Sequence, residues 1–153
     1  MDEKYMDIAI DEAKKAFKND EVPVGAVIVY NGKILAKTHN EKEQRMCSVA
    51  HAEILAIEQA TKKIKNWRLC DCDLYVTLEP CPMCASAIKQ SRIRNVYSGL
   101  ASEDKQNSEI VERIFGVDSL NPSVNHFNNL KSIEIDAMMK SFFEKQRKRN
   151  VNK

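Results

Sequence analysis

The stretch that decides the fold is residues 73–84, which read DLYVTLEPCPMC. Its first half, Asp73 to Leu78, is rich in apolar and β-branched residues and predicts a short strand. The prolines that follow interrupt this strand, and a helix is predicted from Met83 to Gln90. Another strand is predicted from Arg94 to Ser98. Because two strands joined through a helix need a right-handed crossover, this segment predicts a parallel portion of sheet.

The residues before this stretch predict a helix, a hairpin and a second helix. Apolar residues recur at helical spacing from Met6 to Phe17. The apolar run 24–30, the turn Asn31-Gly32 and the run 33–38 then form a hairpin signal. Residues 39–48 are polar and predict a loop, and helical spacing resumes from about Val49.

The residues after the stretch have a weaker pattern. A helix is predicted near Ser108 to Phe115, a short strand at Lys131 to Ile135, and a closing helix at residues 136–149 that carries a basic end. Hairpin and crossovers together predict an α/β protein with a mixed central sheet between helices, in three α/β/α layers. We expect one domain, residues 1–153.

Composition excludes several classes of protein. Hydrophobic residues make up 43% and there are only 4 Gly and 4 Pro, so neither disorder nor low complexity is expected. No apolar stretch has the length of a signal peptide core or a membrane span, and we expect a cytoplasmic protein without membrane contact. Two of the five cysteines form a Cys-x-x-Cys pair, which in a reducing compartment indicates metal or redox chemistry.

Four residues form a pattern typical of a catalytic metal site. Cys81 and Cys84 are spaced to share one face of a helix turn, and His51 lies at the start of the preceding predicted helix. These helix starts are expected side by side at one edge of the sheet, where their partial positive charge favours thiolates. Glu53 follows His51 by two positions, so on a helix the two side chains converge only at its very beginning.

The ligand count predicts catalysis rather than a structural role. His51, Cys81 and Cys84 supply three zinc ligands, and no fourth Cys or His follows at ligand spacing, so one position stays open for water. Zinc lowers the pKa of bound water to about 7. Glu53 is placed to transfer the proton of that water to a leaving group.

His-x-Glu followed by Pro-Cys-x-x-Cys resembles the signature of the zinc nucleobase deaminases, within the cytidine/deoxycytidylate deaminase superfamily. The resemblance is to the bacterial tRNA-specific adenosine deaminases in particular. It is carried by the stretches 21–26, 50–54, 74–84 and 91–93, and it resumes at 125–126 and 141–143.

The resemblance implies a cytidine deaminase-like fold and hydrolytic conversion of adenosine to inosine at the wobble position of tRNA anticodons. It also implies a homodimer with one zinc ion per subunit, held by His51, Cys81 and Cys84, with Glu53 as the proton shuttle. Residues expected to contact the substrate are Asn40, Ala52 and His126. The basic residues Arg147, Lys148 and Arg149 are expected to contact the RNA backbone of the anticodon stem-loop.

Two departures from the family pattern keep other functions open. The loop at residues 100–109 contains no glycine, and Cys47-Ser-Val49 replaces an Asp-Pro-Thr sequence. One alternative is therefore a deaminase of a free base or nucleoside, such as guanine or cytosine. A third hypothesis, from another class and independent of these departures, is a zinc-binding module without catalytic turnover.

Overall fold

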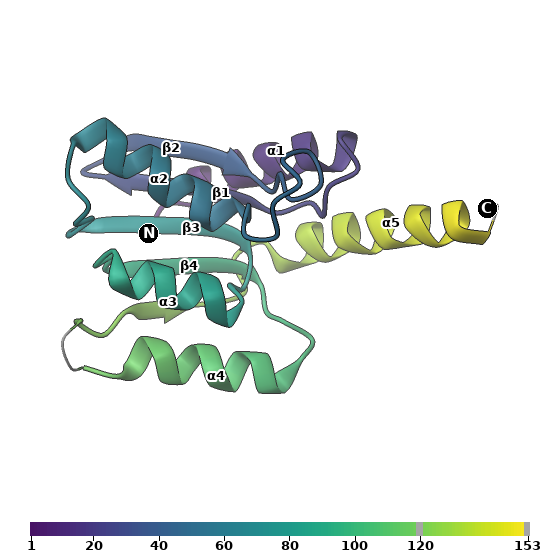
Figure 1. Ribbon diagram of the computed structural model, residues 1–153. Helices are drawn as coiled ribbons and strands as arrows, with labels where there is room; N and C mark the ends of the chain where they lie inside the picture. The colour runs from purple at the N-terminus through teal and green to yellow at the C-terminus, as the bar shows by residue number, and fades with distance from the viewer. Residues whose placement is uncertain (119–120, 152–153) are drawn as a thin grey trace.

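A five-stranded sheet in the order β2-β1-β3-β4-β5 forms the centre of the molecule (Figure 1). The computed structural model describes residues 1–118 and 121–151. Along the chain the elements are α1 (Glu3–Lys18), β1 (Gly25–Tyr30), β2 (Lys33–His39), α2 (Ala52–Ile64), β3 (Cys72–Leu78), α3 (Pro82–Gln90), β4 (Asn95–Leu100), α4 (Lys105–Gly116), β5 (Asn125–Phe127) and α5 (Ser132–Val151).

The pairing of the strands confirms the predicted mixed sheet. β1 runs antiparallel to both β2 and β3, whereas β3, β4 and β5 run parallel to one another. The hairpin around Asn31-Gly32 and the crossover through α3 both form as predicted. The carboxyl ends of β3 and β4 therefore meet at one edge of the sheet.

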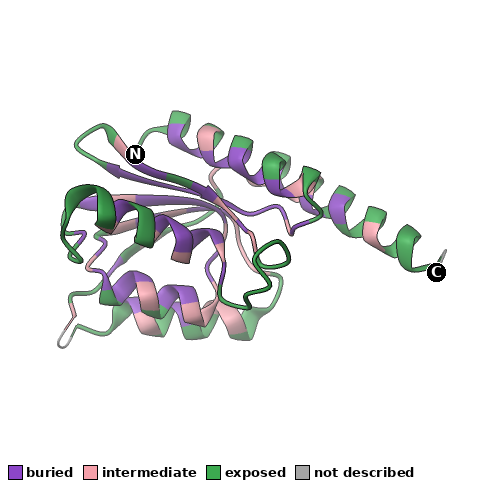
Figure 2. Ribbon diagram, turned by 45° about the horizontal axis from the view of Figure 1, so that its top comes forward, coloured by how far each residue is buried: buried purple, intermediate pink, exposed green. Residues whose placement is uncertain are grey.

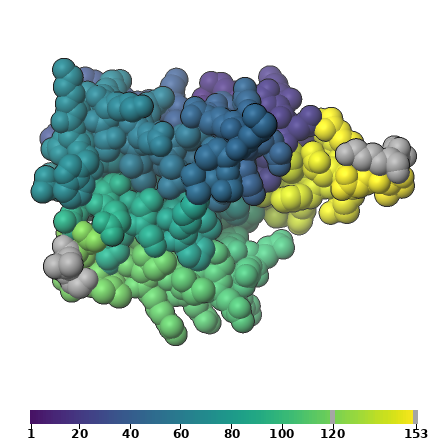
Figure 3. All heavy atoms as spheres, viewed as in Figure 1, coloured from purple at the N-terminus to yellow at the C-terminus, as the bar shows by residue number. Residues whose placement is uncertain are grey.

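Helices cover both faces of the sheet, as the alternation of buried residues along the strands requires (Figures 1 and 2). Ala26 and Ile28 of β1 pack with α2, α3 and α4 on one face. Val27 and Val29 pack with α1 and α5 on the other. The far end of α5 is largely exposed and projects beyond the sheet (Figures 2 and 3). The three-layer α/β/α prediction is confirmed.

Two glycines allow close packing between layers. A Cβ atom on Gly25 would lie 1.9 Å from the carbonyl oxygen of Ala9, so α1 lies directly against the start of β1. A Cβ atom on Gly99 would lie 2.1 Å from Cδ1 of Ile135 and 2.7 Å from the carbonyl oxygen of Thr77. Helix α5 thus approaches β4 at this glycine.

One predicted element is wrong. Residues 131–135 were expected to form a strand, but α5 already begins at Ser132, and the last strand is the short β5. Ile135, Met139 and Phe142 are the buried residues of α5, and their spacing is helical. The alternation of Ile133 and Ile135 resembles a strand only because Ile133 is apolar although 87% exposed.

No helix in the described part of the chain combines the length and the apolar character needed to cross a lipid bilayer.

Candidate active site

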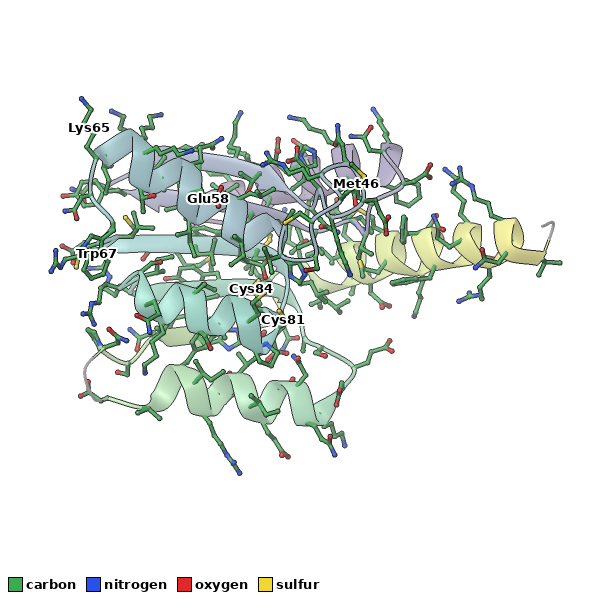
Figure 4. The ribbon with its side chains drawn as sticks, viewed as in Figure 1. Met46, Glu58, Lys65, Trp67, Cys81 and Cys84 are labelled. Atoms are coloured by element: carbon green, nitrogen blue, oxygen red, sulfur yellow. The ribbon has the colours of Figure 1, made fainter. Side chains whose placement is uncertain are left out.

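The site lies where α2 and α3 begin, at the carboxyl end of β3 (Figure 4). His51 is the N-cap of α2 and Cys81 the N-cap of α3, both with extended backbone. Within the described residues neither side chain makes a capping hydrogen bond, so both remain directed to other contacts. Because His51 precedes the helix rather than lying on it, the spacing of His51 and Glu53 does not keep them apart.

His51, Cys81 and Cys84 come together as one group. Nδ1 of His51 is 3.8 Å from Sγ of Cys81 and 3.4 Å from Sγ of Cys84. All three ligand atoms lie within 4.8 Å of one another. A tetrahedral zinc with bonds of roughly 2.3 Å to sulfur and 2.0–2.1 Å to nitrogen separates these atoms by about 3.6 Å. The donor set and its spacing therefore fit a metal ion.

The electrostatics of the group distinguish the two thiols. Hydrogen bonds from Cys84 and from His51 lower the pKa of Cys81 to about 4 despite its partial burial. The pKa of Cys84 is raised, first by its hydrogen bond to Cys81 and then by burial. The pKa of His51 is raised by its hydrogen bond with Cys81. The partial positive charge of two helix N-termini also favours negative charge at this position.

Glu53 lies in the first turn of α2 and is 4% exposed. Burial raises its pKa, and the nearby His51 opposes this effect only in part. A carboxyl group whose pKa is raised by burial holds a proton more readily than an exposed glutamate, so beside the candidate metal ligands it can accept a proton and pass it on. This is the property required of an acid–base catalyst.

A cavity of about 260 Å³ opens onto this group. The predicted residues Asn40 and Ala52 line it together with His51, Glu53 and Cys81. Asn40 is held in place, since its Oδ1 accepts from the Lys42 N–H at 3.1 Å and its Nδ2 donates to the Val22 carbonyl at 3.3 Å. The cavity is thus a preformed pocket beside the candidate metal ligands.

Several cavity residues were not identified from the sequence. They are Val22, Val24, Lys42, Leu78, Glu79, Ser102 and Asn107. Ser102 and Asn107 follow β4, which ends beside β3, so parallel pairing brings them to the site. The signal available for Glu79 was its place directly before Pro80 and Cys81, where an acidic residue follows a buried strand.

His126 does not belong to the cavity lining. Its side chain is 1% exposed and lies between Ser98, whose Oγ is 2.8 Å from Nε2, and Glu112, whose Oε1 is 2.5 Å from Nδ1. His126, Glu112 and Glu79 offer ligand atoms within 4.8 Å of one another. The structure thus places His126 near Glu79, outside the set of residues that border the cavity.

Of the predicted basic residues, Arg149 lies near the site. It lines a groove of about 490 Å³ together with Phe143 of α5. This groove shares Val22, Asn40 and Lys42 with the cavity, so the two are continuous. Arg149 also pairs with Asp20 at 2.8 Å. Arg147 and Lys148 are exposed but do not line the groove.

Comparison with known proteins identifies relatives that carry out deamination. The MafB19-like deaminase family model matches residues 1–147. A tRNA-specific adenosine deaminase of Bacillus subtilis (strain 168) is 42% identical over 148 residues, which cover 97% of this chain and 92% of that protein.

Two solved structures extend the comparison. One, from a study of A-to-I editing by tRNA:A34 deaminases at the wobble position of transfer RNA, has a TM-score of 0.81 and 36% identity, and covers 88% of this chain and 97% of that one. A guanine deaminase from Bacillus subtilis has a TM-score of 0.64 and 34% identity, and covers 72% of this chain and 71% of that one.

Proposed function

The chain belongs to the family of the tRNA-specific adenosine deaminases, and on that premise we propose that it converts adenosine to inosine at the wobble position of tRNA anticodons. The observation that carries the proposal is the buried carboxyl of Glu53 beside the group of His51, Cys81 and Cys84, in the wall of one cavity. A site of this kind can hydrolyse an exocyclic amine.

We propose that His51, Cys81 and Cys84 hold one zinc ion. Two cysteines and one histidine are a ligand set that zinc prefers, and three protein ligands leave a position open. When bound, zinc supplies Lewis acidity that makes water nucleophilic near neutral pH.

The protein's own residues move the proton and place the base. Glu53 accepts a proton from the attacking water and transfers it to the amino group of adenine as the bond at C6 breaks. Water supplies the oxygen of inosine, and ammonia leaves. We propose that Asn40 and Ala52, which border the cavity, contact the nucleoside.

The groove beside the cavity supports an RNA substrate. An anticodon-loop base is already unpaired, so its entry into a pocket costs little. Lys42 and Arg149 line the groove beside the acids Asp20, Glu21 and Glu43, so the positive charge available to phosphates comes from the basic end of α5 rather than from the groove as a whole. Phe143 is 43% exposed in the groove and offers a surface on which a base can stack. Arg147 and Lys148 extend the basic end of α5, and we propose that they contact the phosphate backbone of the RNA. We also propose that the enzyme works as a homodimer in the cytoplasm.

The first experiment measures inosine formation in a tRNA anticodon stem-loop by the wild type and by Glu53→Gln, with the zinc content of both determined. We expect Glu53→Gln to retain zinc and to lose about 10²–10⁴-fold or more in kcat, because proton transfer is removed. A zinc-loaded wild type that forms no inosine would contradict the proposal, as would full activity of Glu53→Gln.

Guanine deamination is the second candidate. It is favoured by the likeness to the guanine deaminase of Bacillus subtilis and by the glycine-free segment 100–109, which was expected to be a loop but forms the end of β4, a short connection and the start of α4. The same enzyme preparations are therefore assayed for ammonia release from free guanine. Release from guanine by a zinc-loaded protein that does not edit RNA would support this candidate.

A further inference from the structure

Glu79 is a buried acid that the proposed reaction does not use. It is 4% exposed and follows the last residue of β3. Its Oε2 accepts two hydrogen bonds, from the Ser102 N–H at 2.8 Å and from the Ser108 hydroxyl at 2.8 Å. One carboxylate oxygen thereby joins the end of β3 to the loop after β4 and to the first turn of α4.

These contacts fix one wall of the cavity. Ser102 and Asn107 border the cavity, and Asn107 is additionally tied to the Pro80 carbonyl by an Nδ2–O contact of 3.5 Å. The cysteine turn and the loop are therefore held together at two points, through Glu79 and through Asn107. Hydrogen bonds to a carboxylate are stronger than those between neutral groups, so these contacts restrict a polar loop.

We propose that Glu79 is a positioning residue, which holds Ser102 and Asn107 in the cavity wall and so sets the affinity for the substrate. The inference rests on the proposed function and assigns the loop at residues 101–104 and the first turn of α4 a place in that same site. Glu79 acts through the Ser102 backbone N–H and the Ser108 hydroxyl, which fix the chain on which Ser102 and Asn107 lie, and does not itself touch the reacting atoms.

The second carboxylate oxygen of Glu79 makes it possible to distinguish a positioning role from a role that requires the negative charge. Within the described residues, Oε1 is buried and has no hydrogen-bond partner. Both donors bind the other oxygen, so a glutamine can present its carbonyl oxygen to Ser102 and Ser108 and place its NH₂ where Oε1 lies. A proton-transfer or metal-binding role needs the carboxylate and would be lost in glutamine.

Glu79→Gln and Glu79→Ala are compared with the wild type for inosine formation, zinc content and thermal unfolding. We expect Glu79→Gln to stay within about twofold of the wild type, and Glu79→Ala to raise KM by about tenfold or more with kcat little changed. A higher KM with an unchanged kcat is expected when a variant loses binding energy equally in the ground state and in the transition state. Ser108→Ala, which removes one donor and keeps the acid, should raise KM by less. Glu103→Gln, an exposed acid of the same loop, serves as the matched control.

Amide hydrogen exchange at residues 101–104 tests the clamp without any assay of activity. We expect faster exchange in Glu79→Ala than in the wild type and Glu79→Gln, so the clamp is judged even if no RNA is edited and the proposed function fails. The inference is overturned if glutamine is as damaging as alanine, if kcat falls while KM is unchanged, or if exchange is the same in all variants. A second bound metal ion that Glu112→Ala removes would also overturn it, because Glu79 would then be a ligand.

Discussion

His51 and Cys81 occupy positions at which other proteins place helix-capping residues. Serine, threonine, asparagine or aspartate at an N-cap satisfies a backbone N–H and stabilises a helix by about 0.5–2 kcal/mol relative to alanine. In the described structure neither His51 nor Cys81 makes such a bond. The side chains are directed instead toward each other, so α2 and α3 begin with less stabilisation in exchange for a ligand set.

This arrangement predicts a conflict between stability and metal binding at position 51. In a chelator, His51→Asn should be more stable than His51→Ala by about 0.5–2 kcal/mol, because asparagine caps α2. With zinc, the wild type should gain stability and both variants should gain much less. Urea unfolding followed by circular dichroism measures all three proteins. Equal stability of the two variants in chelator would show that the residue at the N-cap of α2 does not affect the free energy of unfolding.

At the scale of the element, α5 connects the sheet to the groove beside the cavity. Its first turns pack on β4 through Ile135 at Gly99, and its later turns carry Phe143 and Arg149 into the groove. The helix has one narrow buried side, formed by Ile135, Met139 and Phe142, and is otherwise exposed or half-buried. Its position therefore depends on a few apolar contacts between its beginning and its middle, including the edge-on contact of Phe142 with Phe17, whose ring centroids are 5.7 Å apart.

The two isoleucines at the start of α5 should respond very differently to truncation. Ile135→Ala should cost about 2–5 kcal/mol, because Ile135 is fully buried. Ile133→Ala should stay within about 0.5 kcal/mol, because Ile133 is 87% exposed on the opposite side of the helix. Chemical denaturation of both variants provides the measurement. Similar losses at 133 and 135 would instead indicate that both side chains face the core, as in a strand.

At the scale of the whole molecule, two buried acids hold the loops on either side of the cavity. Glu79 holds the loop after β4, and Glu21 accepts from the Glu43 and Gln44 N–H groups at 2.9 and 2.8 Å. The second loop carries Met46 outward, with 92% of its surface exposed (Figure 4). Val49 is 46% exposed on the same loop. An ordered loop with exposed apolar residues is a suitable surface for a second copy of the chain.

Met46→Asp should weaken the proposed homodimer, because a charge would be buried in an apolar contact. We expect the wild type to have twice the chain mass by light scattering at micromolar concentration. The dimer dissociation constant of the variant should be about tenfold higher or more than that of the wild type. Ile133→Asp, exposed on α5, is the control and should leave the mass unchanged. A monomeric wild type, or a Met46→Asp protein as dimeric as the control, would argue against this surface.

Much of this architecture follows from local sequence. The hairpin at Asn31-Gly32, the strand Cys72–Leu78 and the helix after Pro82 are set by turn chemistry, β-branched runs and proline, which act within a few residues. The zinc-ligand candidates His51, Cys81 and Cys84 were predicted from spacing and resemblance, and the structure brings them together.

Long-range packing decided what local sequence could not. Ile133 and Ile135 have the same hydrophobicity, and only the packing of Ile135 against Gly99 and the apolar cluster on that face of the sheet shows which one is buried. Glu79, Ser102 and Asn107 come from separate segments and share a cavity wall only because β3 and β4 are parallel neighbours. The sequence by itself determined the elements up to β4 and the candidate metal-ligand pattern, since those depend on short-range preferences, but it missed β5 and misassigned the start of α5. The tertiary structure alone decided the shape of the substrate cavity, because residues distant along the chain form it.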